Sequence, residues 1–210
     1  RGNAKNLDLN RDFIKADSKN TLTFYKIFQF LDPHIFVDTH TSNGADYKHI
    51  MTLITSQTDK MHPKIRNYTT QKLNPALYEG MSKKNYDMVP YVHQIKKTPD
   101  DGIQDYLETP RYSTGYTNLF NCISYVTEAH MLKPYQQRVE STYEFLDILI
   151  QYIFVQISIL KNLNHKINCK KGIKRCFKEE FIFPSLIIYY IILLKAGFIV
   201  NINYNNDATI

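Results

Sequence analysis

The sequence contains no tryptophan and only three cysteines among its 210 residues. Cys122, Cys169 and Cys176 form no Cys-x-x-Cys pair, and an odd number of cysteines gives no complete disulfide framework. The seven histidines form no His-x-His or His-x-x-x-His spacing. The cysteine and histidine spacings exclude a zinc ribbon and a disulfide-stapled fold. Because tryptophan is absent, aromatic packing must come from the 16 tyrosines and 12 phenylalanines.

No secretory signal peptide is visible, but the chain starts at Arg1, and we expect its natural N-terminus to lie upstream. The formal net charge is +6, and up to Leu146 the basic residues are mixed with carboxylates, as on an ordinary solvated surface. We therefore predict no nucleic-acid partner. The length is sufficient for one domain with a substantial core.

The composition changes near Asp147. Residues 1–146 contain 9 isoleucines, whereas residues 147–210 contain 15, together with many Asn, Lys, Tyr and Phe residues. We therefore divide the chain into a domain over residues 1–146 and an Ile/Asn/Lys-rich tail over residues 147–210. The tail has two interpretations, either frame-shifted or unselected sequence, or a genuine membrane segment.

The candidate membrane segment is residues 181–200, "FIFPSLIIYYIILLKAGFIV". A helix needs about 20 apolar residues to cross a bilayer, and this run reaches that length only by including Pro184 and Lys195. A basic cluster between Lys170 and Lys178 precedes it, as is typical of a cytoplasmic flank. Membrane contact through residues 181–200 is therefore retained as one hypothesis.

Residues 1–146 alternate between helical and strand-like patterns. Helical spacing predicts helices over 19–31 and 133–150, the second with Val139, Tyr143, Leu146 and Ile150 on one face. Residues 73–81 indicate a short helix or turn. Apolar runs predict buried strands at 34–40, 50–55 and 123–128. This alternation favours an α/β fold, with a mixed, mostly parallel sheet and helices on both faces.

Three polar residues follow predicted strands. His40 follows Ile35–Thr39, Glu128 follows Ile123–Thr127, and Arg11 comes just after a strand signal at Leu7–Leu9. Because ligands bind beyond the carboxyl ends of strands in such sheets, we expect these three side chains to converge on one crevice.

The chemistry that suits this set is zinc-assisted hydrolysis. A neutral His is a zinc ligand, a carboxylate can act as general base on a metal-bound water, and an Arg binds a substrate carboxylate through its planar fork. Structural alternatives remain open. His40 could be an ordinary hydrogen-bonded histidine at a strand end, and Glu128 could be a carboxylate at a helix N-terminus. Arg11 and Asp8 could form a surface ion pair.

Three segments together resemble the zinc carboxypeptidase family of the carboxypeptidase A and T type, most closely its bacterial peptidase branch. They are "DLNRDF", "VDTHTSNGADY" and "PRYSTGYTNLFNCISYVTEAHMLKPYQQRV". The resemblance extends from Arg1 to about Leu146 and ends where the composition changes. It implies a three-layer α/β/α zinc-peptidase fold.

The resemblance also implies a role for each matching residue. His40 is similar to the third zinc ligand, and Glu128 to the general base. Asn10 and Arg11 resemble the pair that binds the terminal carboxylate of a peptide substrate. The remaining matches are Asp8 as the carboxylate that orients a zinc histidine, Arg1 as the arginine that polarises the scissile carbonyl, and Tyr106, Tyr112 or Tyr116 as the mobile tyrosine that closes the site.

One part of the family pattern is missing. The family's first two zinc ligands come from a His-x-x-Glu motif, and this chain contains no such motif. We therefore expect a fragment truncated at its N-terminus, with an incomplete Zn²⁺ site, an unpaired sheet edge and no activity on its own.

The expected function of the family is hydrolysis of C-terminal peptide bonds by a secreted or periplasmic enzyme. The alternatives are a zinc-dependent amidase or deacylase, or a non-catalytic truncated product with a membrane-attached tail.

Overall fold

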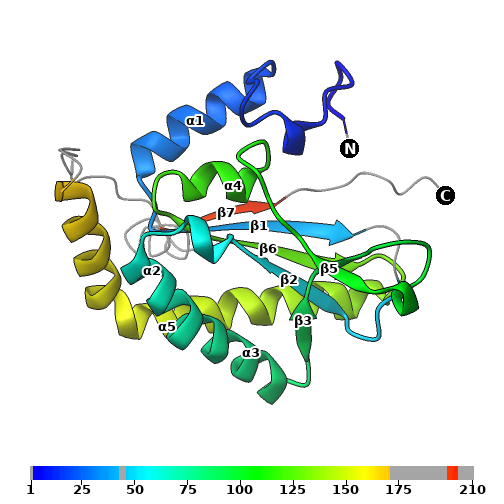
Figure 1. The fold of residues 1–210 in the computed structure, drawn as a ribbon. Coiled ribbons are helices and arrows are strands. Elements are labelled where there is room, and N and C mark those ends of the chain that lie inside the picture. The colour runs from blue at the N-terminus through cyan, green and yellow to red at the C-terminus, as the bar shows by residue number, and fades with distance from the viewer. Residues whose placement is uncertain (1, 43–45, 171–197, 203–210) are drawn as a thin grey trace.

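The computed structural model describes residues 2–42, 46–170 and 198–202. Its centre is a five-stranded sheet in the order β3-β2-β6-β1-β7 (Figure 1). β1 (Ile35–Ser42) pairs in parallel with β6 (Ile123–His130) and with β7 (Phe198–Ile202). β2 (Met51–Thr55) is antiparallel to β6 and parallel to β3 (Met88–Pro90). The predicted mixed, mostly parallel α/β sheet is confirmed.

The helices lie on both sides of this sheet (Figure 1). On one side are α1 (Lys19–Leu31) and α4 (Ser113–Asn118). On the other are α2 (Pro63–Tyr68), α3 (Asn74–Lys83) and α5 (Tyr135–Lys170). A π-helical turn, Thr69–Leu73, joins α2 to α3, and short 3-10 turns occupy Thr58–Lys60 and Pro99–Asp101. A separate hairpin pairs β4 (Val92–Gln94) with β5 (Ile103–Asp105).

Alternating residues of the central strands supply two cores. Ile35 and Val37 of β1 point into the larger core, which α2, α3 and α5 cover. Phe36, between them, points into a smaller aromatic core with Phe28 of α1 and Tyr116 of α4. This two-sided burial explains why β1 begins as a continuous apolar run rather than an alternating one.

The predicted helix over 19–31 coincides with α1 in both bounds. Ser18 caps its N-terminus by accepting a hydrogen bond from the backbone N–H of Thr21 at 3.1 Å. Asp32 ends the helix in a left-handed conformation, with φ of 45°. The local sequence therefore defined this element completely.

The predicted apolar face of the helix at 133–150 is wrong in part. Val139 and Tyr143 are exposed, and the buried face of α5 carries Phe145, Leu149 and Ile153. The physical reason is the position of the sheet, because these three side chains are buried in the larger core, whereas Leu146 and Ile150 of the predicted face pack against that core and are only partly buried. Period alone fixes which residues share a face, but not how the helix is rotated against its neighbours.

The change in composition at Asp147 falls inside α5, which continues to Lys170. Beyond it, β7 pairs in parallel with β1 at one side of the sheet. The candidate membrane segment, residues 181–200, lies outside the described residues except for Phe198–Val200, which belong to β7. None of the helices in the described ranges combines the length and the apolar character that a membrane crossing requires.

Candidate functional site

His40 and Glu128 lie side by side on one face of the sheet. They are direct partners in the parallel β1–β6 pair, so their side chains project in the same direction. Nδ1 of His40 lies 3.5 Å from Oε1 of Glu128. Both residues lie within the last three positions of their strands, rather than after them as predicted. This position excludes the alternative that Glu128 begins a helix.

A chain of contacts connects His40 to the N-terminal segment. Nε2 of His40 lies 3.1 Å from Oδ2 of Asp38, which is fully buried. The hydroxyl of Ser113 donates to the same carboxylate oxygen at 2.5 Å. The backbone N–H of Ser113 in turn donates to Oδ1 of Asn10 at 3.1 Å. Four segments far apart in the sequence therefore meet through Asn10, Ser113, Asp38, His40 and Glu128.

The sequence-based prediction did not include Asp38 or Ser113. Asp38 was treated only as part of a buried strand. Its position two residues before His40 was the available signal, because residues i and i+2 of a strand lie on the same face. Ser113 carried no comparable signal, since its contact with Asp38 depends on the tertiary position of α4.

The predicted strand at Leu7–Leu9 is wrong. Leu9–Arg11 form a 3-10 turn, and Asp8 caps that turn by accepting a hydrogen bond from the backbone N–H of Asn10 at 3.1 Å. The apolar pattern at Leu7–Leu9 does not produce a strand, because the Asp8 side chain caps the turn that follows. The strand-like pairing here is limited to a single bridge between Gly2 and Asp8. The carboxylate of Asp38 contacts His40, and the predicted role of Asp8 in orienting a zinc histidine stays a prediction.

The three tyrosine candidates occupy different positions. The guanidinium carbon of Arg11 lies 4.3 Å from the ring centroid of Tyr112, and the ring of Tyr106 contacts Tyr112 at 5.5 Å. Tyr116 is buried in the aromatic core and stacks on Tyr25 at 4.7 Å. A substrate contact therefore fits Tyr106 or Tyr112, but not Tyr116. The remaining predicted site residue, Arg1, lies outside the described residues.

The two carboxylates control the charge of His40. Burial opposes protonation of the imidazole, but Asp38 and Glu128 outweigh this effect and raise the pKa of His40 to about 10. In the metal-free chain His40 is therefore a cation at neutral pH, held between two carboxylates. A metal ion must replace the proton on Nδ1 before His40 can act as a ligand.

Three buried polar atoms of the strand residues on this face have no hydrogen-bond partner among the residues that the structure describes. They are Oγ1 of Thr52, the β2 partner of Glu128, together with Oε2 of Glu128 and Nε2 of His130. The other ring nitrogen of His130, Nδ1, lies 2.6 Å from Oγ of Ser42, and its ring stacks on Tyr47 at 4.4 Å. Buried polar atoms without partners are uncommon in proteins and are expected where a ligand or water binds.

The fit of this site to zinc is partial. Contact of Asp38 with Nε2 of His40 leaves Nδ1 as the nitrogen that faces Glu128, which is the arrangement of a carboxylate-oriented zinc histidine. A catalytic zinc, however, needs about three protein ligands. Within 2–42, 46–170 and 198–202, no group of three or more His, Cys, Asp or Glu side chains is arranged to hold a metal ion. The described residues therefore offer one candidate ligand, His40, and one carboxylate that contacts it.

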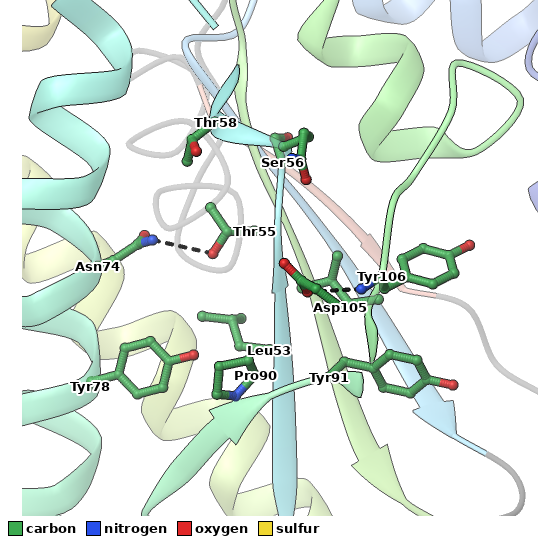
Figure 2. Close-up of a pocket in the computed structure, with 12 residues that line it drawn as sticks. Leu53, Thr55, Ser56, Thr58, Asn74, Tyr78, Pro90, Tyr91, Asp105 and Tyr106 are labelled. Carbon is green, nitrogen blue, oxygen red and sulfur yellow. Dashed lines mark hydrogen bonds between the residues drawn. The ribbon is translucent and has the colours of Figure 1, made fainter. Parts of the chain in front are cut away.

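A cavity of about 290 Å³ lies next to Tyr106 (Figure 2). Its walls come from β2 and the segment after it, from α3, and from Pro90, Tyr91, Asp105 and Tyr106. Because Tyr106 contacts Tyr112, which packs on Arg11, the cavity is two aromatic rings away from the guanidinium. No pattern in the sequence indicates this cavity, since its walls come from four separate segments.

Comparisons with known proteins do not identify a relative of this chain: no protein-family model matches it, and no curated protein or solved structure is significantly similar to it.

Proposed function

We propose that this chain carries part of the active site of a zinc-dependent carboxypeptidase, which hydrolyses the last peptide bond of substrates with a free C-terminal carboxylate. The observation that carries the proposal is the continuous set of contacts from Asn10 through Ser113, Asp38 and His40 to Glu128. It brings a carboxylate-supported imidazole and a second, partly unpartnered carboxylate to one face of the sheet, with a guanidinium in the adjoining turn.

The proposed roles follow from the chemistry of these groups. His40 supplies one zinc ligand, and Asp38 fixes the orientation of its ring. Glu128 accepts a proton from water, and the unpartnered oxygen Oε2 is available for this task. Arg11 binds the C-terminal carboxylate, while Tyr112 supports the plane of the guanidinium. Zinc, when bound, would lower the pKa of its water and polarise the carbonyl group.

The chain as it stands is expected to be inactive, because one histidine does not hold a catalytic zinc. We propose that a His-x-x-Glu segment, which this sequence does not contain, supplies the other two ligands in a three-layer zinc-peptidase domain. The full enzyme would then be secreted or periplasmic, as in the family that the sequence resembles. A zinc amidase acting on small acylated amino acids would use the same groups.

The decisive experiment compares this chain with an extended protein, defined as the same chain lengthened with its upstream genomic coding sequence. Zinc is titrated into both, and both are assayed with N-acylated dipeptides and with acylated amino acids. The proposal expects stoichiometric zinc binding and hydrolysis only in the extended protein. An extended protein that binds zinc but cleaves only acylated amino acids would support the amidase, and one that binds no zinc would contradict both.

A further inference from the structure

Two side chains hold the backbone of Gln57 at both of its polar groups. Oε1 of Glu108 accepts a hydrogen bond from the Gln57 N–H at 2.7 Å, and Nδ2 of Asn118 donates to the Gln57 carbonyl oxygen at 3.5 Å. Gln57 lies between Ser56 and Thr58, and these three residues line the cavity at the end of β2 (Figure 2). The contacts of Glu108 and Asn118 therefore fix the position of one wall of that cavity.

The two side chains come from neighbouring parts of the fold. Asn118 is the last residue of α4, and Glu108 belongs to the segment that leads into this helix. This segment lies close against α4, because a Cβ on Gly115 would lie 2.0 Å from the carbonyl oxygen of Thr109. Both side chains therefore reach Gln57 from the same part of the structure.

Each of these side chains has one buried oxygen without a hydrogen-bond partner among the residues that the structure describes, Oε2 of Glu108 and Oδ1 of Asn118. Glu108 is fully buried, and Asn118 is 5 % exposed. The orientation of the Asn118 amide follows from its contact, because only the NH2 group can donate to the Gln57 carbonyl. With Glu108 ionised, both oxygens are acceptors and neither satisfies the other. A carboxylic acid removes this mismatch, since its O–H group donates and the amide oxygen accepts.

The charged groups around Glu108 come from two other segments. Lys60, in the 3-10 turn Thr58–Lys60, donates to the backbone carbonyl of Glu108 rather than to its carboxylate. Burial raises the pKa of Glu108 above its ordinary value of 4.5. The N–H donors of Gln57 and of Glu108 itself, and the charge of Lys60, oppose this rise in the pKa, whereas the charge of Asp105 adds to it. The surroundings of Glu108 therefore favour its neutral form.

We propose that Glu108 and Asn118 form a pH-sensitive clasp on Gln57, which tightens when Glu108 takes up a proton. In the protonated state the Oε2–H group of Glu108 donates to Oδ1 of Asn118, while Oε1 still accepts from the Gln57 N–H. In the ionised state Oε2 and Oδ1 are two buried acceptors without a donor, which is unfavourable. Residues 56–58, and the cavity wall that they form, are therefore held more firmly in mildly acidic solution than at higher pH.

The sign of the effect on stability follows from proton uptake. A carboxyl group with a raised pKa binds its proton more tightly in the folded chain than in the unfolded chain, so stability falls as the pH rises. The contribution of Glu108 is complete below about pH 4.5 and is lost as the pH rises through the raised pKa of the folded chain. The clasp needs neither zinc nor substrate, so it does not depend on the proposed function.

Glu108→Gln in the 210-residue chain imitates the protonated side chain, because its amide oxygen accepts from Gln57 and its NH2 group donates to Asn118. Urea unfolding at pH 8 should show that this variant is more stable than the wild type, with a folding equilibrium constant about fivefold higher or more. The difference should be smaller at pH 5, where the wild type carries the proton. Glu79→Gln is the matched control, since Glu79 is an exposed carboxylate of α3 paired with Lys83, and it should give no gain.

Two further measurements locate the effect at the clasp. The hydrogen-exchange protection of the Gln57 amide should fall from pH 5 to pH 8 in the wild type and stay constant in Glu108→Gln. Asn118→Ala removes the acceptor, so Glu108→Gln should lose most of its gain in that background.

Equal or lower stability of Glu108→Gln at pH 8 would overturn the inference, because it would show an ionised Glu108 whose Oε2 is satisfied by water. A gain of the same size at pH 5 and pH 8 would show that Glu108 does not titrate in this range. A gain that persists in the Asn118→Ala background, or Gln57 protection that does not fall with pH in the wild type, would equally contradict the clasp.

Discussion

His40 and Glu128 are direct neighbours across the β1–β6 pair, with Nδ1 of the imidazole 3.5 Å from Oε1 of the carboxylate. In the metal-free chain this contact is an ion pair, because the pKa of His40 is raised to about 10 by its two carboxylate neighbours despite burial. A proton and a metal ion compete for the same nitrogen. Zinc binding to His40 should therefore release a proton and free the Glu128 carboxylate for catalysis.

Glu128→Gln in the extended protein should retain zinc and lose most of its turnover. The amide cannot accept a proton from water, and loss of a general base typically costs about 10²–10⁴ in rate. The measurement is kcat with an N-acylated dipeptide, alongside zinc content. Asp46→Asn, an exposed carboxylate paired with Lys133, is the control and should leave kcat unchanged. Loss of zinc in Glu128→Gln would show that Glu128 is a ligand instead of the base.

Arg11→Ala should weaken binding of N-acetylglycyl-norleucine about 10- to 100-fold, because a bidentate charge-assisted contact contributes about 1.5–3 kcal/mol. The corresponding C-terminal amide should lose less than about threefold by the same reasoning. Calorimetry on the 210-residue chain provides both affinities. Arg66→Ala, which removes an exposed guanidinium paired with Asp59, should change neither. An equal loss for acid and amide would contradict the assignment of the carboxylate to Arg11.

The elements that the sequence predicted correctly share strong local signals. β1 and β6 are apolar runs buried on both faces, and α1 has a serine cap at its first turn and a stop at Asp32. These signals depend on neighbouring residues only, so they can be recognised without knowledge of the fold. The missed strands β3, β4 and β5 are three residues long and have no comparable pattern, and the missed helices α2 and α4 are six residues long. The strand β7 was also missed, because its residues fall in the tail that was interpreted as a candidate membrane segment.

Only one feature of the candidate site could be predicted from the sequence, namely that side chains near the carboxyl ends of neighbouring strands lie close together. That argument brought His40 and Glu128 together correctly, but it placed Arg11 after a strand that is a capped turn. Ser113, which connects Asn10 to Asp38, depends for its position on how α4 packs on the sheet, and no periodicity encodes that position. Sequence patterns specify which face a side chain occupies, whereas contacts between separate segments depend on packing.

Asp12→Asn should destabilise the fold by about 1–2 kcal/mol at pH 7, because Asp12 accepts charge-assisted hydrogen bonds in the loop that follows Arg11. Its carboxylate accepts from the backbone N–H groups of Asp17 and Ser18, at 2.9 and 3.0 Å, and from the Thr21 hydroxyl at 2.7 Å. Burial raises the pKa of Asp12, but these hydrogen bonds outweigh burial and lower it from 3.8 to about 2.

A lowered pKa means that the stabilisation is complete above about pH 4 and is lost as the pH falls through about 2. Urea unfolding at pH 7, 5, 3.5 and 2.5 should therefore show a constant gap between wild type and Asp12→Asn down to pH 5, and a narrowing gap below pH 4. Asp17→Asn, which alters only an exposed pair with Lys15, should show little change. A gap that stays constant at all four pH values would contradict this explanation.

Gly115→Ala should destabilise the fold by more than about 2 kcal/mol, because overpacking against backbone atoms cannot be relieved by a rotamer change. A Cβ at Gly115 would lie 2.0 Å from the carbonyl oxygen of Thr109. The segment 109–112 would have to move away from α4, and this would disturb the first residue of that helix, Ser113, whose hydroxyl donates to Asp38. Chemical denaturation measures the first effect, and the affinity for N-acetylglycyl-norleucine reports the second.

Gly80→Ala is the matched comparison within α3. A Cβ there would lie 2.7 Å from Cγ2 of Ile148, a side-chain atom that can shift, and alanine is favoured over glycine in a helix by about 1 kcal/mol. We therefore expect a small net change in stability for Gly80→Ala and unchanged ligand affinity. If the two variants were equally stable and bound the ligand equally well, the close approach of Thr109 to α4 would not be what positions Ser113 against Asp38.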